Sequence, residues 1–268
     1  MARVKGVFQM AGSLSGVSFY TRRGSDEVIV RTKGGPGKNT IKNRKSCQAL
    51  RENGAEWGGC TRAASNLRRA LEGLMRLADN NAMGGLNALC KKIQCMDTEN
   101  EKGKRSVLIR DNIQMLKDFN FNKTNLFDSV IRLTPAWHIN REAVSATVII
   151  PDFHPEVQLF APNKLPYMRF VIVLGVSSNV AFDQNSKRYK AVDDLLPGYC
   201  VEEHTVWFPV KRTMSEQILE VQIEGIANYL TESDALVLGM GVEFGTVGAD
   251  GEGEAVKYAG CAKVLGGV

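Results

Sequence analysis

The residues with the most suggestive chemistry lie in the stretch RTKGGPGKNT at positions 31–40, which combines glycines with lysines. A phosphate-binding P-loop has the pattern G-x-x-x-x-G-K-[ST], because successive backbone amides surround the phosphates and the hydroxyl holds Mg²⁺. Gly37 and Lys38 match the G-K pair, but Thr32 replaces the first glycine and Asn39 replaces the hydroxyl residue. The stretch therefore predicts a chain reversal between two elements and not a nucleotide site.

Side chains for acid–base or metal chemistry are few. Of the three histidines, His154 follows Asp152 at a spacing that puts both on one face of a strand, but no further ligands are indicated. The patterns G-x-S-x-G, H-E-x-x-H and G-x-G-x-x-G do not occur in the sequence. We therefore expect a protein that is not an enzyme and has no cofactor, no bound metal and no small-molecule substrate. The other two histidines are His138 and His204.

Six cysteines are too few for a disulfide framework in a chain of 268 residues. Zinc sites usually bring their thiolates in close pairs such as C-x2-C. Only Cys90 and Cys95 are nearly that close, and on a helix they would point about 140° apart. We expect buried free thiols. The remaining cysteines are Cys47, Cys60, Cys200 and Cys261.

Charge is unevenly distributed along the chain, whose net charge is +5. Residues 1–125 carry 23 Lys and Arg against 11 Asp and Glu, whereas residues 126–268 carry 11 against 18. This asymmetry indicates an acidic partner for the first part, either a nucleic acid or the acidic part of a second copy. The candidate residues for binding such a polyanion or partner are Arg22, Arg23, Arg31, Lys33, Lys38, Lys42, Arg44, Lys45, Arg62, Arg69 and Arg76.

A β-hairpin is predicted near the N-terminus, from VSFYT at 17–21 and EVIVRT at 27–32. Both are rich in β-branched and aromatic residues, and RRGSD between them favours a turn. A lone hairpin is marginal in water, and its edge can add a strand to a neighbour's sheet. The candidate residues of this assembly hairpin are Phe19, Tyr20, Val28, Ile29 and Val30.

Helical periodicity follows the glycine-rich stretch. A first helix is expected after Thr40, and WGGC at 57–60 is expected to end it, because paired glycines are poor helix formers. A second helix runs through TRAASNLRRALEGLMRLAD and a third through GGLNALCKKIQCM. A fourth is predicted from about Ser106. The apolar residues that recur at helical spacing include Leu67, Leu71, Leu74, Ile109, Ile113 and Leu116.

From about residue 130 the apolar period changes to two, which indicates strands. About seven strands without strong helices between them predict an antiparallel sandwich like that of immunoglobulins. The expected fold class is therefore α+β, with an N-terminal hairpin and helices followed by an immunoglobulin-like β-sandwich. We place the boundary between a basic region at 1–125 and the sandwich at 126–268.

The overall composition is that of a globular protein, with 44% apolar and 24% charged residues. No apolar run approaches the roughly 20 residues that cross a bilayer, and the first residues contain no sustained apolar segment typical of a secretion signal. We expect a cytoplasmic protein without a membrane partner.

Several stretches are similar to those of a family of Bacteroidota proteins. They are VRTKGGPGKNTIKN, RENGAEWGGC, LNALCKKIQ, EKGKRSVL and FDSV. The resemblance covers most of the chain and implies a recurring bacterial architecture, with a basic hairpin and helical region before a β-sandwich. It implies no activity and assigns no role to any residue.

These observations favour a structural or assembly protein that forms a homo-oligomer through strand addition by the hairpin and through the opposite charges of its two parts. The alternative is a nucleic-acid-binding module that uses the basic N-terminal part, although no helix-turn-helix, RNP or zinc-finger pattern supports it.

Overall fold

The computed structural model describes residues 2–4, 11–22, 25–32, 34–162, 164–248 and 253–268. The chain forms two compact units, Met1–Arg51 and Glu52–Val268. Helices and antiparallel sheets occur together, which confirms the α+β class. The units divide after Arg51 and not at the expected boundary near residue 125.

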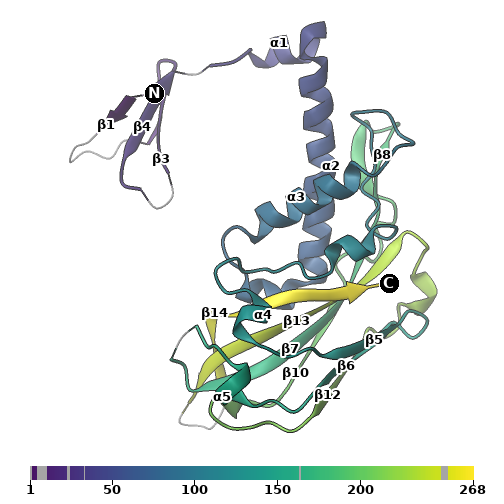
Figure 1. Ribbon diagram of the computed structural model, residues 1–268. Coiled ribbons are helices and arrows are strands. Elements are labelled where there is room, and N and C mark those ends of the chain that lie inside the picture. The colour runs from purple at the N-terminus through teal and green to yellow at the C-terminus, as the bar shows by residue number, and fades with distance from the viewer. Residues whose placement is uncertain (1, 5–10, 23–24, 33, 163, 249–252) are drawn as a thin grey trace. The chain divides into compact units, whose positions relative to one another are not determined.

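The first unit contains a four-stranded antiparallel sheet in the order β1-β4-β3-β2 (Figure 1). In its central pair, Phe19 lies opposite Val30 and Tyr20 opposite Ile29, so the predicted hairpin is confirmed. The glycine-rich stretch then leads to α1 (Lys38–Asn43) and the short 3-10 helix η1 (Lys45–Cys47). The strands are β1 (Ala2–Val4), β2 (Gly12–Leu14), β3 (Val17–Thr21) and β4 (Val28–Thr32).

Helix α2 (Gln48–Ala70) is continuous through the WGGC stretch, so the expected break at 57–60 is wrong. Gly59 lies against the ring of Tyr189, and its Cα leaves room for that ring. The apolar residues of the helix beyond it, such as Leu67, are buried against the second unit's sheet. Intrinsic propensity is a weak prior, and here the packing outweighs two helical glycines.

The second unit contains two main antiparallel sheets and a two-stranded hairpin. One sheet has the order β10-β7-β13-β14 with β11 also paired to β7, another has the order β12-β6-β5, and β8 pairs with β9. The first sheet consists of β7 (Tyr167–Ser178), β10 (Cys200–His204), β11 (Phe208–Pro209), β13 (Asp234–Val247) and β14 (Gly253–Gly267). The others are β5 (Ala136–Asn140), β6 (Ser145–Ile150), β12 (Gln217–Gln222), β8 (Val180–Asp183) and β9 (Arg188–Ala191).

The five-stranded sheet is buried on both faces. Phe170, Ile172 and Leu174 share a core with the three-stranded sheet, whereas the intervening Val171 and Val173 share a core with the helices. The resulting layers are helices, five-stranded sheet and three-stranded sheet (Figure 1). Because residues before and after position 125 contribute to one core, position 125 does not separate two compact units. A strand covered on both faces reads as a continuous apolar run, as YMRFVIVLGVSS does.

The helical layer contains α2, the 3-10 helix η2 (Glu72–Leu77) and α3 (Ala82–Gln94). The predicted fourth helix is wrong apart from the single turn η3 (Ile113–Leu116). Val107 forms an isolated β-bridge with Val180 where that helix was expected to begin. The short helices α4 (Phe127–Val130), α5 (Pro155–Gln158) and η4 (Ala227–Tyr229) connect strands. Among the described residues, no helix combines the length and apolarity needed to cross a bilayer.

Candidate functional site

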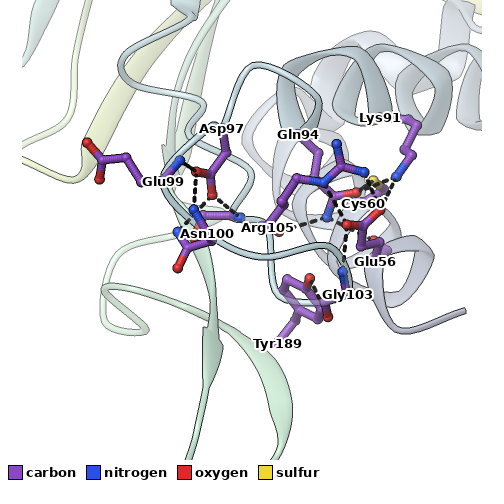
Figure 2. Close-up of polar contacts among 11 residues, drawn as sticks. Glu56, Cys60, Lys91, Gln94, Asp97, Glu99, Asn100, Gly103, Arg105 and Tyr189 are labelled. Carbon is purple, nitrogen blue, oxygen red and sulfur yellow. Dashed lines mark hydrogen bonds and ion pairs between the residues drawn. The ribbon is translucent and has the colours of Figure 1, made fainter. Parts of the chain in front are cut away.

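The carboxylate of Glu56, which is fully buried on α2, accepts four hydrogen bonds. Arg105 makes a two-point contact, with Nε donating to Oε1 at 2.7 Å and Nη2 donating to Oε2 at 2.8 Å. Lys91 Nζ donates to Oε2 at 2.6 Å, and the amide of Gly103 donates to Oε1 at 2.9 Å (Figure 2). Both oxygens are therefore saturated by donors from α3 and the loop that follows it.

These donors favour the ionised carboxylate. The hydrogen bond from Arg105 is the largest influence and, with Lys91 and Gly103, it lowers the pKa of Glu56 to about 2 despite the burial. The same contact raises the pKa of Arg105. Glu56 is an acceptor only at neutral pH and has no proton to give, so this arrangement suits a fixed ionic clamp and not a general acid.

Cys60, one turn further along α2, belongs to the same network. Its Sγ lies 3.3 Å from Oε1 of Gln94, which also accepts from Lys91 Nζ at 2.9 Å. Gln94 Nε2 donates to the carbonyl oxygens of Glu56 and Arg105. Burial raises the pKa of the Cys60 thiol to about 11, so the nucleophilic thiolate is scarce at neutral pH.

The loop after α3 is held by Asp97. Its carboxylate accepts the backbone amides of Glu99, Asn100 and Ser106 and the side-chain amide of Asn100 (Figure 2). Burial alone would raise the pKa of Asp97, but these donors lower it below its ordinary value. The bonds fix the turn that presents Arg105 to Glu56.

Three stretches that are far apart in the sequence meet at this carboxylate. RENGAEWGGC supplies Glu56 and Cys60, LNALCKKIQ supplies Lys91 and Gln94, and EKGKRSVL supplies Arg105 with the amide of Gly103. Nothing in the sequence marks Glu56 as buried, and its partner Arg105 is 49 residues away. The network therefore became visible only in three dimensions.

A second ionic cluster surrounds Glu243 of β13, whose side chain is 1% exposed. Arg169 Nε donates to its Oε2 at 2.7 Å, and Arg76 pairs with its other oxygen. His204 Nε2 lies 2.8 Å from Arg76 Nη2, and Glu202 lies 3.5 Å from Arg76 Nη1. Burial first, and then the charge of Arg169, lower the pKa of His204. With a guanidinium as its neighbour, Nε2 accepts a hydrogen bond and the imidazole is neutral.

The structure places the described cations of the predicted set in the first unit on its surface. Arg51 Nη1 donates to the carbonyls of Ile41 and Arg44, which ties α1 to the start of α2. Arg23 and Lys33 lie outside the described residues. The exposed members of the predicted set are Arg22, Arg31, Lys38, Lys42, Arg44 and Lys45.

The other three predicted cations have different surroundings. Arg62 is 51% exposed and lies 3.7 Å from Asp194, whereas Arg69 donates to Asn66. Arg76 belongs to the Glu243 cluster, in η2 and not on α2. Arg62 and Arg69 therefore share α2, which ends at Ala70, and Arg76 lies beyond it.

In the predicted hairpin, Val28 and Ile29 are buried and Phe19, Tyr20 and Val30 are half-buried. Arg31 lies over the ring of Tyr20, with its guanidinium carbon 5.8 Å from the ring centre. The hairpin therefore presents its aromatic residues partly to solvent.

The cysteines are free thiols. Cys60, Cys90 and Cys261 are buried, Cys47 and Cys200 are half-buried, and Cys95 is exposed. Within the part of the chain that the structure describes, no group of three or more His, Cys, Asp or Glu side chains is arranged to hold a metal ion.

Comparison with known proteins identifies no relative of this chain. No protein-family model, curated protein or solved structure matches the chain.

Proposed function

We propose that the protein is a non-enzymatic structural or assembly protein that self-associates through its N-terminal unit, Met1–Arg51. The observation that carries this proposal is the small core of that unit. Of its described side chains, only Val28 and Ile29 are buried. A sheet with so little buried apolar surface is marginal by itself and gains stability when it packs on another surface.

One face of the sheet is suited to such packing. Val17, Phe19, Val28 and Val30 lie on one face, because residues opposite each other or two apart in register share a face. Leu14, opposite Val17, extends that face and is 69% exposed. An apolar face with an exposed leucine favours a protein partner.

The edges of the sheet offer a second mode of contact. Strands β1 and β2 form the two edges and have three residues each. Edge strands carry backbone donors and acceptors that another strand can pair with, and strands of this length restrict such pairing to a few hydrogen bonds.

Charge favours a second copy as the partner. Residues 1–51 carry eleven Lys and Arg against two Asp and Glu, a net charge of +9, whereas residues 52–268 carry 23 against 27, a net charge of −4. The basic unit of one copy is therefore complementary to the remainder of the next, and such attraction speeds and orients association.

The second unit suits the role of a rigid scaffold. Its buried carboxylates Glu56 and Glu243 are each held by two cations. We further propose that its two packed sheets correspond to the immunoglobulin-like sandwich that the sequence predicts, with the helical layer added to one side. Sandwiches of this kind often serve binding and assembly, which is an analogy of fold only.

Light scattering coupled to size-exclusion chromatography tests the proposal with the full chain at low and high salt. We expect an oligomer that dissociates in Leu14→Asp, because this exposed side chain contributes little to the monomer. The matched control is Val206→Asp, at a site that is 80% exposed in the second unit. A chain that is monomeric at low salt, or an oligomer indifferent to Leu14→Asp, contradicts the proposal.

The exposed cations of the first unit also favour a second candidate, a nucleic-acid-binding module. Such binding weakens steeply as salt rises, because neutralised phosphates release counterions. Reversing the charges of Arg22, Lys38 and Lys42 is expected to abolish it, measured by fluorescence anisotropy with a labelled duplex. Absence of any binding by the unaltered chain at low salt excludes this candidate.

A further inference from the structure

A groove of about 330 Å³ lies between α2 and the β8–β9 hairpin, entirely within the second unit. Its volume is at the small end of the range for ligand sites, about 300–1,000 Å³. In Figure 1 the hairpin stands beside α2, and Tyr189 of β9 is fixed there by its contact with Gly59 and by its hydroxyl, 3.2 Å from the carbonyl oxygen of Gly103. The walls of the groove are therefore held in place by contacts already formed.

The floor of the groove is the bare backbone of α2 at Gly54 and Gly58. A Cβ atom at either position would meet no atom within 4 Å, unlike one at Gly59, which would meet Tyr189. Glycine is the poorest helix former after proline, and the chain's own packing does not require it at these two positions. Glycine here leaves room for a flat group to approach the helix closely.

Three cations surround that floor: Lys187 and Arg188 on the hairpin, and Arg62 on α2, which also lies 3.7 Å from the exposed Asp194. Within the described residues, no side chain pairs with Lys187 or Arg188. Asp183, the acidic residue of the hairpin, lies opposite Arg188 in register and is bonded to Lys190 at 2.6 Å and to Ser186 at 2.7 Å. The hairpin therefore keeps a net positive charge, with three cations against one carboxylate.

An aromatic ring completes the groove. Phe182 lines it and is held edge-to-face against Tyr189, with ring centres 5.3 Å apart. Cations interleaved with an exposed aromatic side chain are the usual means of binding single strands, because phosphates meet the cations and unstacked bases stack on the ring.

We propose that the groove between α2 and the β8–β9 hairpin binds single-stranded nucleic acid. Lys187, Arg188 and Arg62 contact phosphates, and a base lies between Phe182 and the glycine floor. The positive charge selects against a cationic partner, and the floor without side chains favours a planar base over the bulkier side chains of an acidic peptide. This site is separate from the basic N-terminal unit and goes beyond the assembly role.

Fluorescence anisotropy with a short fluorescein-labelled oligouridylate tests the proposal on the full chain. Lys187→Glu with Arg188→Glu is expected to weaken binding about tenfold or more, because two phosphate contacts are lost and two repelling charges take their place. The matched control is Lys211→Glu with Arg212→Glu, which alters the same exposed dipeptide elsewhere in the second unit and changes net charge equally. The cations of the first unit remain in both variants, so the difference reports the groove.

Gly58→Leu provides a second variant that keeps the positive charge. Its side chain fills the groove, and since leucine is a good helix former the melting temperature is expected to stay or rise. Loss of oligouridylate binding in this folded variant supports the proposal. Equal weakening by the two charge-reversal pairs, unchanged binding by Gly58→Leu, or no binding by the unaltered chain at low salt overturns it. A preference for poly-glutamate over oligouridylate also overturns it.

Discussion

Gly175 of β7 lies directly against the carbonyl oxygen of Ala70, the last residue of α2. There is no room for a Cβ atom between them. On the neighbouring strand β13, the side chain of Leu74 packs on Gly239 in the same way. The helical layer can approach the five-stranded sheet this closely because the sheet carries glycines at the crossing.

Replacing Gly175 by alanine is therefore expected to destabilise the second unit. The added methyl group would force α2 away from the sheet, and overpacking of a tight core costs about 1–3 kcal/mol or more. Urea unfolding followed by circular dichroism measures the change. Gly54→Ala is the control, and we expect it to raise the free energy of unfolding by up to about 1 kcal/mol, because its Cβ enters open space on a helix. Equal midpoints for the two variants contradict this account.

Removing the charge of Glu56 is expected to destabilise the helical layer strongly. Glu56→Gln leaves Lys91 and Arg105 without their buried counter-charge, and breaking a buried pair in this way costs about 3–5 kcal/mol. The control is Glu101→Gln, which removes a partner of Lys104 from an exposed pair worth at most about 1 kcal/mol. If both variants unfold at the same urea concentration as the unaltered chain, the contacts of Glu56 with Lys91 and Arg105 do not stabilise the fold.

The same carboxylate predicts a loss of stability in acid. The pKa of Glu56 is about 2 in the folded chain against an ordinary value of 4.5. Its contribution is therefore present above the ordinary value and is lost as the pH falls toward the folded pKa. Thermal melts from pH 6 to pH 3 are expected to show a decline that is smaller in Glu56→Gln. An identical decline in both chains contradicts the assignment.

His204 predicts a separate change near neutral pH. Burial and the charges of Arg169 and Arg76 lower its pKa, and they outweigh the opposite influence of Glu202 and Glu243. Since the folded pKa lies below the ordinary value of about 6.5, the neutral imidazole stabilises the fold above that pH and the contribution is lost as the pH falls. Melting temperatures between pH 8 and pH 5.5 are expected to vary less in His204→Gln. An equal change of melting temperature with pH in the unaltered chain and in His204→Gln contradicts this role of His204.

Thiol reactivity is expected to separate the cysteines by burial. Cys95 is exposed and should react first with a disulfide reagent, whereas burial raises the pKa of Cys90 to about 12 and that of Cys60 to about 11. These two should react only on unfolding. Mass spectrometry of timed samples identifies the modified residue. Early modification of Cys60 would show that the Glu56 network opens in solution.

Local elements were predictable where neighbouring residues determine them. The hairpin of residues 17–21 and 27–32 and the strands that begin after residue 130 follow from alternation and turn chemistry. The expected break at WGGC failed because the contact of Tyr189 with Gly59 and the packing of the helix on the sheet are long-range. The fourth helix failed for a similar reason, since Val107 at its expected start forms a β-bridge with the distant Val180.

The amino-acid sequence by itself determined the segregation of charge, the hairpin, the α+β class and the two-residue period of the C-terminal strands, because each depends on composition or on residues close along the chain. Only the tertiary structure decided that the five-stranded sheet is covered on both faces and that Glu56 meets Arg105, 49 residues away. It also decided that glycines line a groove beside Lys187 and Arg188. Burial and long-range pairing depend on how distant segments pack, and no local pattern specifies that packing.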